Sequence, residues 1–343
     1  MLTIRDVAKL AGVSVATVSA VMNDKGGVSE KLSKRVREAM EALDYHPNQV
    51  ARSLKVQETR TIGMVVPDVA NSFFTDVIKG AENEARAQGY SLILCDSAED
   101  PSVEQDNLNA LFARRVDGVL LSPTKAYVAQ DRLIRRRFPL VFFDRIAPGF
   151  EGSAVVTNNL LAAHDATRYL IGLGHRRIAI ITGQLSWSNG LDRLEGFRTA
   201  LQESGLPLRE EYLQRGDFQS ESGYSCGLKL LQLPLPPTAV FCCNNHMTLG
   251  FTRALRELGI PCPGLVSVLG FDDFDWAAYL TPRLTTVAQA TFEMGKQAVQ
   301  MLLGKMESHK RGDEEVERKL TVLTAELRVR DSTAPPPLGD GAA

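Results

Sequence analysis

Hydrophobic residues in the first 45 positions recur every three or four residues, a spacing that is typical of short amphipathic helices. One such stretch runs from Ile4 to Ala11, after Thr3 as a candidate N-cap, and a second runs from Val15 to Met22. Gly12 between them permits a tight turn. A third stretch runs from Ser29 to Leu43. The pattern predicts three helices, of which the first two form a helix-turn-helix.

A short apolar stripe follows these three helices. Residues 48–55 can form a helix that Asn48 caps, with Val50, Ala51 and Leu54 on one face. A helix of this length is not stable alone in water, so it needs a partner. We expect that partner to be the same helix of a second copy, which leaves Leu54 free to wedge between base pairs in a DNA minor groove.

The pattern changes after Arg60, where short apolar runs alternate with amphipathic stretches of helix length. The predicted strands are Ile62–Val66, Ser91–Cys95, Gly118–Leu121, Leu140–Phe143, Ile178–Thr182, Ala239–Cys243, Val266–Leu269, Leu284–Val287 and Leu320–Leu327. The predicted helices lie near 73–88, 102–115, 159–172, 190–203, 220–232, 246–258 and 290–304. This alternation favours parallel sheets with helices on both faces. Because the units are too many for one small sheet, we predict two doubly wound subdomains with a ligand cleft at the carboxyl ends of their strands.

Length and charge support a division into domains. The chain has 343 residues and a mass of 37.6 kDa, more than one compact core usually holds. Its net charge is −2, but residues 1–60 carry +3 and the remainder carries −5. A basic end on an otherwise acidic chain indicates contact with nucleic acid. With 44% hydrophobic residues, the composition excludes a disordered, collagen-like or disulfide-rich protein.

The sequence predicts neither export nor a metal site. The N-terminal residues lack the apolar segment of a signal peptide, and no apolar run approaches the roughly 18 residues of a membrane span. The five cysteines have no regular spacing, and Cys242 and Cys243 lie in an apolar run where buried thiols are expected. We expect a cytoplasmic protein with no metal, no cofactor and no membrane partner.

A series of short motifs near the N-terminus, in a fixed order along the chain, resembles a known family. They are Thr3-Ile4, Asp6-Val7-Ala8, Ala11-Gly12-Val13-Ser14, Ala16-Thr17-Val18-Ser19, Val28-Ser29, Leu43-x-Tyr45-x-Pro47-Asn48 and Val50-Ala51-Arg52-Ser53-Leu54. On these residues, positions 3–56 resemble the DNA-binding headpiece of the lactose/galactose repressor (LacI-type) family. The resemblance implies a headpiece over residues 1–47, followed by a hinge helix and linker over residues 48–60.

The resemblance also implies which side chains contact DNA, because each occupies a position that matches the family's motif. The implied DNA-contacting residues are Thr3, Ser14, Val15, Ala16, Thr17, Ser19, Ala20, Asn23, Leu54 and Lys55. Among them, Val15, Ala16 and Ala20 take the base-reading positions, and Leu54 is the intercalating residue. Many relatives carry Arg or His where this chain has Ala20. Since a methyl group cannot make the bidentate contact that Arg makes to guanine, we expect apolar contacts to thymine methyl groups instead.

The resemblance continues over residues 61–330, where a second series of motifs follows in the same order as in the family. They are Ile62-Gly63-x-Val65-Val66-Pro67, Val116-Asp117-Gly118, Gly174-His175-Arg176-x-Ile178-Ala179, Arg193-x-x-Gly196-Phe197, Asn244-Asn245-x-Met247, Gly270-Phe271-Asp272-Asp273 and Pro282-x-Leu284-Thr285-Thr286-Val287. They resemble the family's effector-binding domain, a type I periplasmic-binding-protein-like α/β fold of two parallel-sheet subdomains. The family pattern implies an N-subdomain of residues 61–157 and 288–317 and a C-subdomain of residues 158–287 and 318–330. Residues 331–343 are rich in Pro, Gly and Ala, which predicts a disordered tail.

Polar residues at strand ends mark the candidate effector site. Asp144, Asn244 and Asp272 each follow an apolar run, and carboxylates and amides that converge on a cleft can bind vicinal hydroxyls. Arg193 adds a fork of donors, and aromatic rings can stack on the apolar face of a sugar. The candidate aromatic residues are Phe73, Phe74, Trp187 and Phe218. In the family, the positions that match the polar residues contact the effector.

Several of these residues also have a structural interpretation. One of Phe73 and Phe74 can belong to the core, and Trp276 can pack at a domain or dimer contact instead of at a ligand. Asp273 and Asn245 are interpreted as caps of the helices that follow them. His175, in a loop before a strand, is interpreted as structural.

Three classes of function remain to be weighed: a ligand-controlled regulator, a solute-binding protein and an enzyme. Paired carboxylates such as Asp144 and Asp272 suit glycoside hydrolysis, but the sequence has no G-x-S-x-G, P-loop or dinucleotide-binding motif. We therefore expect a dimeric regulator, not an enzyme, that represses transcription from a near-palindromic operator. A sugar, sugar acid or other polyol is the expected effector. A nucleobase-like ligand is the alternative, because Gly216-Asp-Phe218 and Ser222-Gly-Tyr224 are similar to the purine-repressor branch.

Overall fold

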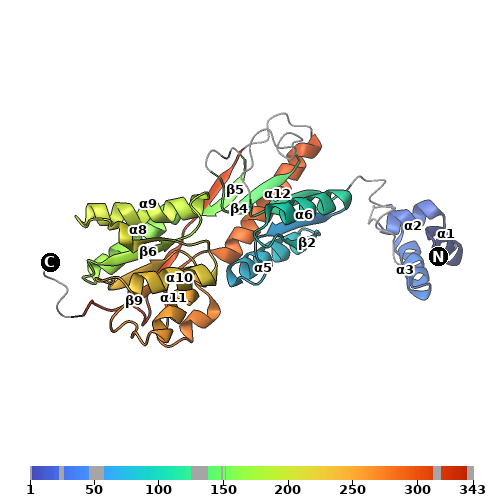
Figure 1. Ribbon diagram of the computed structural model, residues 1–343. Coiled ribbons are helices and arrows are strands. Elements are labelled where there is room, and N and C mark those ends of the chain that lie inside the picture. The colour runs from blue at the N-terminus through green and yellow to red at the C-terminus, as the bar shows by residue number, and fades with distance from the viewer. Residues whose placement is uncertain are drawn as a thin grey trace. The chain divides into compact units, whose positions relative to one another are not determined.

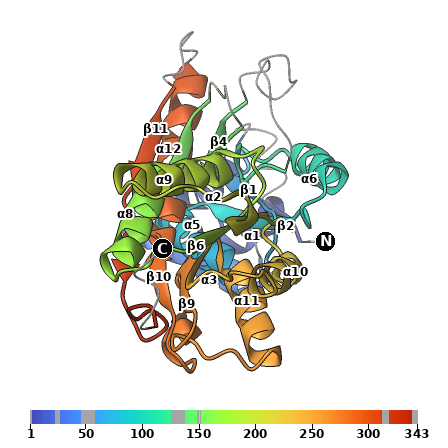
Figure 2. The ribbon, with the colours of Figure 1, turned by 60° about the vertical axis from the view of Figure 1, so that its left-hand side comes forward.

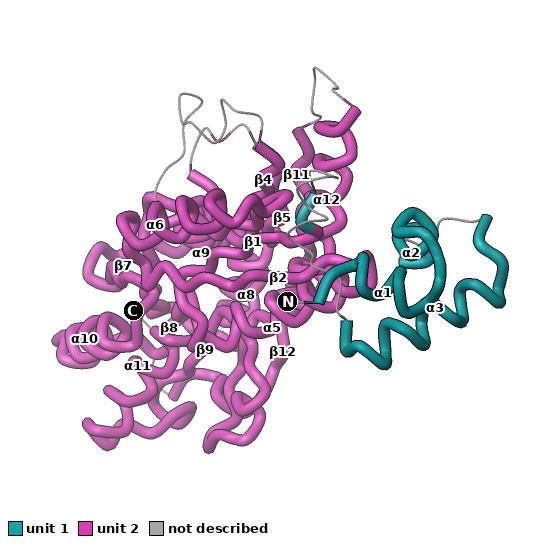
Figure 3. The backbone as a smooth tube through the Cα atoms, turned by 90° about the vertical axis from the view of Figure 1, so that its right-hand side faces the viewer, with its two compact units in different colours: residues 1–59 teal, residues 60–343 magenta. Residues whose placement is uncertain are grey.

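The chain divides into two compact units, residues 1–59 and residues 60–343 (Figure 3). The computed structural model describes residues 2–22, 27–45, 58–124, 138–147, 150, 152–311 and 318–337. Each unit is described below by itself. Asn23 and the whole stretch 46–57, with Leu54 and Lys55, lie outside the described residues.

The first unit contains three helices around a small apolar core. They are α1 (Ile4–Ala11), α2 (Val15–Met22) and α3 (Glu30–Ala42). The buried core residues are Val7, Ala8, Ala11, Val18, Val36 and Ala39. Gly12 adopts φ +61, and the Arg35 guanidinium fills the space where a Cβ would lie while it donates a hydrogen bond to Ala11 O at 2.6 Å. The predicted helix-turn-helix is therefore present, with its turn held by a side chain from the third helix.

The second unit begins with a six-stranded parallel sheet of order β11-β5-β4-β3-β1-β2, the sheet of the N-subdomain. Its strands are β1 (Thr61–Val66), β2 (Ser91–Asp96), β3 (Gly118–Leu121), β4 (Leu140–Asp144), β5 (Ala154–Thr157) and β11 (Leu320–Leu323). Its helices are α5 (Ser72–Ala87), α6 (Pro101–Ala113) and α12 (Thr291–Arg311). Ile62, Met64 and Val66 pack with α5 and α12, whereas Val65 packs with α6 on the opposite face (Figure 1). This alternation of buried residues explains why the strand is apolar throughout.

The C-subdomain repeats this architecture around a sheet of order β12-β10-β9-β8-β6-β7. Its strands are β6 (Ile178–Thr182), β7 (Leu213–Arg215), β8 (Ala239–Cys242), β9 (Ser267–Phe271), β10 (Thr285–Ala288) and β12 (Glu326–Arg328), the last antiparallel to β10. Its helices are α8 (Asn159–Gly172), α9 (Ser188–Glu203), α10 (Ser220–Leu231) and α11 (Asn245–Glu257), with short 3₁₀ turns η1 (Glu210–Tyr212) and η2 (Asp275–Ala278). Helices α8 and α9 cover one face and α10 and α11 the other (Figure 1). The predicted fold class, a helix-turn-helix and two parallel-sheet α/β subdomains, is confirmed.

The chain crosses between the two sheets three times, and the third crossing differs from the prediction. Residues 318–330 were expected in the C-subdomain as one strand, Leu320–Leu327. Instead β11 pairs in parallel with β5 in the N-subdomain, near α12 and β4 (Figure 2), and only β12 belongs to the other sheet. Ala325, between the two strands, donates its N–H to Asn158 Oδ1 at 2.9 Å. No Gly or Pro interrupts this run, so the crossing has no local signal in the sequence.

The prediction of a disordered tail is wrong for residues 331–337. Ser332 is fully buried: its Oγ accepts a hydrogen bond from Thr285 N at 2.7 Å and donates one to Val268 O at 2.6 Å. The carbonyl of Ala334 accepts a hydrogen bond from His175 Nε2 at 2.9 Å, which agrees with a structural role for that histidine. The segment is ordered because β9 and β10 offer it polar partners, and composition alone cannot reveal such partners.

Candidate functional site

A pocket lies between the carboxyl ends of the two sheets, where the prediction placed a cleft. We call it the inter-sheet pocket; it encloses about 440 Å³ of space, part of which is open to solvent. It is lined by Asp68, Asn71, Phe73, Phe74, Glu99, Asp144, Arg145, Asn189, Arg193, Phe218, Gln219, Asn244, Asp272 and Gln289. Seven of the eight candidate effector residues are among them. The eighth, Trp187, is buried beside the pocket, with its ring 4.9 Å from the guanidinium carbon of the pocket residue Arg145.

Two buried carboxylates lie at strand ends in this pocket. Asp144 is the last residue of β4 and Asp272 follows β9; both have positive φ, of 66° and 70°, which residues other than glycine rarely adopt. Such strained conformations occur where the surrounding structure holds a side chain for a function. Burial raises the pKa of Asp144 to about 6, against the opposing charges of Arg145 and Arg193, and the Asp272 charge raises it further. Burial likewise raises the pKa of Asp272, so the pocket disfavours two ionised carboxylates.

Arg193 is the fixed cation of the pocket. It lies on α9, and its guanidinium carbon is 3.6 Å from the centre of the Phe271 ring. Its Nε donates to Asn159 Oδ1 at 2.8 Å and its Nη1 donates to Cys243 O at 2.5 Å. The Nη2 group makes no hydrogen bond within the part of the chain that the structure describes. One donor group of a rigidly held guanidinium therefore remains for a ligand.

The phenylalanines serve both the core and the pocket. Phe73 and Phe74 lie in the first turn of α5, with ring centres 4.9 Å apart in an edge-to-face arrangement, and both also belong to the N-subdomain core. Phe218 has φ 71°, and its ring lies so close to Gly183 that a Cβ there would overlap it. The carbonyl of Phe218 accepts a hydrogen bond from Asn244 Nδ2 at 2.8 Å. These contacts hold the rings rigidly at the walls of the pocket.

Sequence reasoning missed several polar residues of the pocket. Asn71 caps α5 by accepting a hydrogen bond from Phe73 N at 3.0 Å, and Gln289 Nε2 donates to Asp272 Oδ1 at 2.5 Å. Arg145 is already paired: its two terminal nitrogens donate to the Glu99 carboxylate at 3.1 and 2.6 Å, and its Nε donates to Pro123 O. Asn71 lies just before α5, where no strand-end signal marks it, whereas Arg145 and Gln289 directly follow β4 and β10 and could have been found by the signal that marked Asp272.

Direct hydrogen bonds also join the two subdomains, and one of them involves the pocket residue Asn71. Asn245 Nδ2 donates to Asn71 Oδ1 at 2.7 Å and to Ser72 Oγ at 3.2 Å. On another side, Ser188 N donates to Ile146 O at 2.9 Å, and Ile146 N donates to Ser188 Oγ at 3.1 Å. The interpretation of Asn245 as a helix cap is wrong, because Asn244 caps α11 by accepting from Met247 N. Asn245 is instead a bridge across the cleft.

The helix-turn-helix presents a surface of small side chains on α2. Val15 and Ala16 are exposed and Ser19 and Ala20 are half-buried, whereas Val18 is fully buried in the core. Ser14 Oγ accepts a hydrogen bond from Thr17 N at 3.0 Å, so it caps α2. Thr3 N and Thr3 Oγ1 both donate to Asp6 Oδ2 at 2.8 Å at the start of α1. Thr3 and Ser14 therefore stabilise helix starts, in addition to the DNA contacts expected of them.

The cysteines and acidic residues do not form a metal centre in the described part of the chain, where no group of three His, Cys, Asp or Glu side chains could hold an ion. Cys242 and Cys243 are buried free thiols, as predicted, and burial raises the pKa of Cys243 to about 12. Within the described residues, no helix is both long and apolar enough to cross a membrane.

Comparison with known proteins agrees with this architecture. Residues 3–48 match "Bacterial regulatory proteins, lacI family", and residues 167–333 match "Periplasmic binding protein-like domain". The chain is 38% identical over 305 residues to the ribose operon repressor of Escherichia coli (strain K12), covering 88% of this chain and 92% of that protein. The chain belongs to the lacI family. As a member it is a DNA-binding transcriptional regulator with an effector-binding domain of the periplasmic-binding-protein type.

Two further lacI-family relatives are similar to this chain over nearly its whole length. The HTH-type transcriptional repressor PurR of Haemophilus influenzae (strain PittEE) is 38% identical over 337 residues, covering 97% of this chain and 98% of that protein. A crystal structure of the lac repressor dimer bound to operator and the anti-inducer ONPF superposes with a TM-score of 0.83 at 27% identity, covering 97% of this chain and 99% of that one. The likeness therefore extends over the headpiece and both subdomains.

Proposed function

We propose that this lacI-family regulator is a repressor whose operator affinity is controlled by a neutral monosaccharide in the inter-sheet pocket, with D-ribose as the first ligand to test. The observation that carries the proposal is the convergence of Asp144, Asp272 and Arg193 with amide side chains and three phenylalanine rings. Carboxylates accept hydrogen bonds from sugar hydroxyls, amides and the guanidinium donate to sugar oxygens, and rings pack on C–H faces. The ribose operon repressor named above motivates ribose in particular.

The charges of the pocket favour a neutral ligand over a sugar acid or a sugar phosphate. Arg145 is neutralised by Glu99, which leaves Arg193 as the available cation against the buried Asp144 and Asp272. An anionic ligand would meet two carboxylates in a site of low dielectric constant. We propose effector contacts from Phe73, Phe74, Asp144, Arg193, Phe218, Asn244 and Asp272, with Trp187 acting through Arg145.

A nucleobase is the second candidate ligand, because the PurR relative is as similar in sequence as the ribose operon repressor. A purine ring would stack between the phenylalanines and donate N–H groups to the carboxylates. It would leave more of the pocket's amide donors without partners than a polyol does, which disfavours it.

The first unit supplies the DNA-binding half of the proposal. We assign base contacts to Val15, Ala16 and Ala20, and backbone contacts to Thr3, Ser14, Thr17, Ser19 and Asn23. Leu54 and Lys55 are assigned to the minor groove. The protein would act in the cytoplasm as a homodimer on a near-palindromic operator, since each helix-turn-helix reads one half-site. Exposed Trp276 and Tyr279, 44% and 83% accessible, are candidates for burial between the two copies.

We propose that the two sites are coupled through the crossings between the subdomains. A ligand that binds both subdomains changes their relative orientation, and so the distance between the hinge segments 48–60 of the two copies. Paired hinges bind the operator, and separated hinges do not. Whether the ligand releases the operator or strengthens its binding depends on which orientation of the subdomains the ligand favours. The coupling is reciprocal, so the operator changes the affinity for the ligand by the same factor.

Fluorescence titration tests the ligand assignment, because Trp187 packs against the pocket residue Arg145. The full chain is titrated with D-ribose, ribose 5-phosphate and hypoxanthine. We expect saturable binding of ribose that Asp272→Ala abolishes, with Asp106→Asn, on an exposed helix position, as the control that binds normally. Saturable binding of hypoxanthine without ribose would establish the second candidate, and preference for the phosphate would refute the argument from charge.

A further inference from the structure

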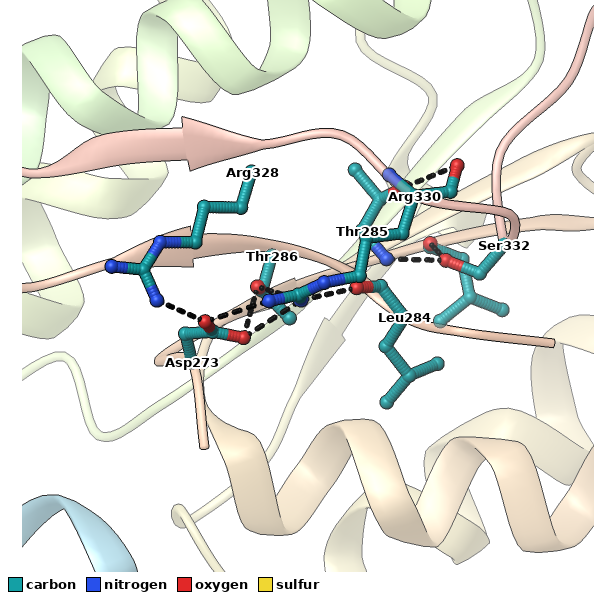
Figure 4. A network of polar contacts seen from close by, with 8 residues as sticks. Asp273, Leu284, Thr285, Thr286, Arg328, Arg330 and Ser332 are labelled. Atoms are coloured by element: carbon teal, nitrogen blue, oxygen red, sulfur yellow. Dashed lines mark hydrogen bonds and ion pairs between the residues drawn. The ribbon is translucent and has the colours of Figure 1, made fainter. Parts of the chain in front are cut away.

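Asp273, the neighbour of the pocket residue Asp272, makes a tight cluster of contacts outside the inter-sheet pocket (Figure 4). Its Oδ1 accepts hydrogen bonds from Thr286 Oγ1 at 2.7 Å and Arg330 Nη1 at 2.8 Å. Its Oδ2 accepts from Arg330 Nη2 at 2.8 Å and Arg328 Nη1 at 2.6 Å. The interpretation of Asp273 as a helix cap is wrong, because η2 begins at Asp275 with Phe274 as its N-cap.

The two arginines come from the end of the chain that has just made the third crossing. Arg328 is the last residue of β12, and Arg330 lies two residues after it. Arg330 Nη1 also donates to Leu284 O at 2.7 Å, and Arg330 N donates to Thr285 Oγ1 at 3.0 Å (Figure 4). The cluster therefore joins the end of β9, the start of β10 and the segment after the third crossing.

Asp272 needs such support, because its backbone is strained. Its φ of 70° lies in the left-handed region that non-glycine residues rarely occupy unless neighbouring contacts hold them there. Its own carboxylate has one side-chain donor, Gln289, which itself accepts a hydrogen bond from Thr157 at the first crossing. The next residue, Asp273, has four hydrogen bonds. These restrain the peptide unit that follows Asp272 and so the direction of its side chain.

We propose that Asp273 is a positioning residue for ligand recognition: its clamp by Arg328 and Arg330 holds the backbone of Asp272 so that the Asp272 carboxylate meets the ligand. This inference rests on the ligand-binding function proposed for the inter-sheet pocket. It makes the segment after the third crossing part of the support of the site, although neither arginine reaches a ligand in the pocket.

The contacts of the two arginines predict unequal effects. The Arg330 side chain is 15% exposed and donates to both carboxylate oxygens of Asp273 and to a carbonyl. The Arg328 side chain is 54% exposed and makes a single contact to Asp273. Removal of Arg330 should therefore displace Asp272 much more than removal of Arg328 does.

The test measures D-ribose affinity by tryptophan fluorescence in full-length variants, well below their unfolding temperatures. Asp273→Asn and Arg330→Gln are expected to raise the Kd by about tenfold or more, because small misplacement of a binding group is costly. Asp273→Glu, which keeps the charge but lengthens the side chain, should not restore binding. Arg328→Gln should raise the Kd by no more than about threefold, as expected for an exposed ion pair. The control is Arg283→Gln, which should bind ribose as wild type does. This substitution breaks an exposed ion pair with Asp331, the residue that follows Arg330.

Hydrogen exchange of the ligand-free chain gives a second readout that does not depend on ribose. In Asp273→Asn, amide exchange around residues 271–274 should accelerate, while β8, in the same sheet, keeps its wild-type rate. If wild type does not bind ribose but this local change occurs, the ligand assignment fails and the positioning role stands. Ribose binding by Asp273→Asn within about threefold of wild type would overturn the positioning role. Unchanged exchange around 271–274, or equal acceleration in β8, would also overturn it.

Discussion

Replacing Asp144 by Asn is expected to stabilise the ligand-free protein, although it removes a group proposed to bind the ligand. Burial raises the pKa of Asp144 from 3.8 to about 6, against the charges of Arg145 and Arg193. The ionised carboxylate is thus disfavoured in the folded chain relative to the unfolded one. Its two side-chain contacts, from Ser122 Oγ at 3.5 Å and Asn189 Nδ2 at 3.4 Å, are long, so an amide loses little.

The magnitude and its pH range follow from the two pKa values of this one carboxyl group. Each pH unit between 3.8 and about 6 corresponds to about 1.4 kcal/mol, so the full penalty is roughly 3 kcal/mol. Below pH 3.8 the group is protonated in both the folded and the unfolded chain and the penalty vanishes. The penalty grows as the pH rises from 3.8 to about 6 and is constant above that. Asparagine is neutral throughout and avoids it.

Urea unfolding of the full chain at pH 8 and at pH 4 measures this effect. The protein has two tryptophans, Trp187 and Trp276, and both belong to the second unit, so their fluorescence reports its unfolding. The Asp144→Asn variant should unfold with a free energy about 2–3 kcal/mol higher than wild type at pH 8, with little difference at pH 4. Asp106→Asn, at an exposed site, should change neither value by more than about 0.5 kcal/mol. A variant no more stable than wild type at pH 8 would refute the argument from burial.

Three further predictions concern ligand affinity, the C-terminal segment and operator choice. Ribose should bind roughly tenfold more weakly at pH 5 than at pH 8, because protonation of Asp144 with its pKa of about 6 removes an acceptor. Fluorescence titration should show this dependence, and Asp144→Asn should reduce it to the part that comes from Asp272, whose pKa burial also raises. Ser332→Ala should lower the free energy of unfolding by about 1–3 kcal/mol, because it leaves buried backbone groups unpaired, while operator and ribose affinities stay unchanged; wild-type stability in urea would contradict the role of this segment. Ala20→Arg should shift operator preference toward guanine at one position of each half-site by about 1–3 kcal/mol, measured by selection from random duplexes, and an unchanged selected sequence would show that residue 20 does not read bases.

Much of the fold could be predicted because its signals are local. Apolar residues every three or four positions predicted α1 to α3, and short apolar runs predicted strands such as β1 and β8. The polar residues Asp144, Asn244 and Asp272 could be predicted as neighbours, because the carboxyl ends of parallel strands meet at the same edge of a sheet. The strand β7 was missed because two of its three residues, Gln214 and Arg215, are polar. The strand β5 is a largely apolar run of four residues, as β8 is, and was overlooked.

The remaining errors concern contacts between residues far apart in the sequence. Asp273 pairs with Arg330, which lies 57 positions away, and Ser332 completes the hydrogen bonds of β9 and β10. Gln289 directly follows β10 and could have been predicted by the strand-end rule, whereas Asn71, the N-cap of α5, lies outside that rule. A residue type alone does not distinguish a helix cap from a bridge across a cleft, so Asn245 and Asp273 were both interpreted wrongly.

Ligand control of operator binding is tested most directly by measuring the operator Kd of the full chain with and without saturating D-ribose. The operator is first selected with the purified protein from random-sequence duplexes, and binding is followed by fluorescence anisotropy. We expect ribose to change the operator Kd by at least about fivefold, and the operator to change the ribose Kd by the same factor. Asp272→Ala should keep operator binding and lose the response. An operator Kd that is the same at saturating ribose as without it would contradict ribose control of this regulator.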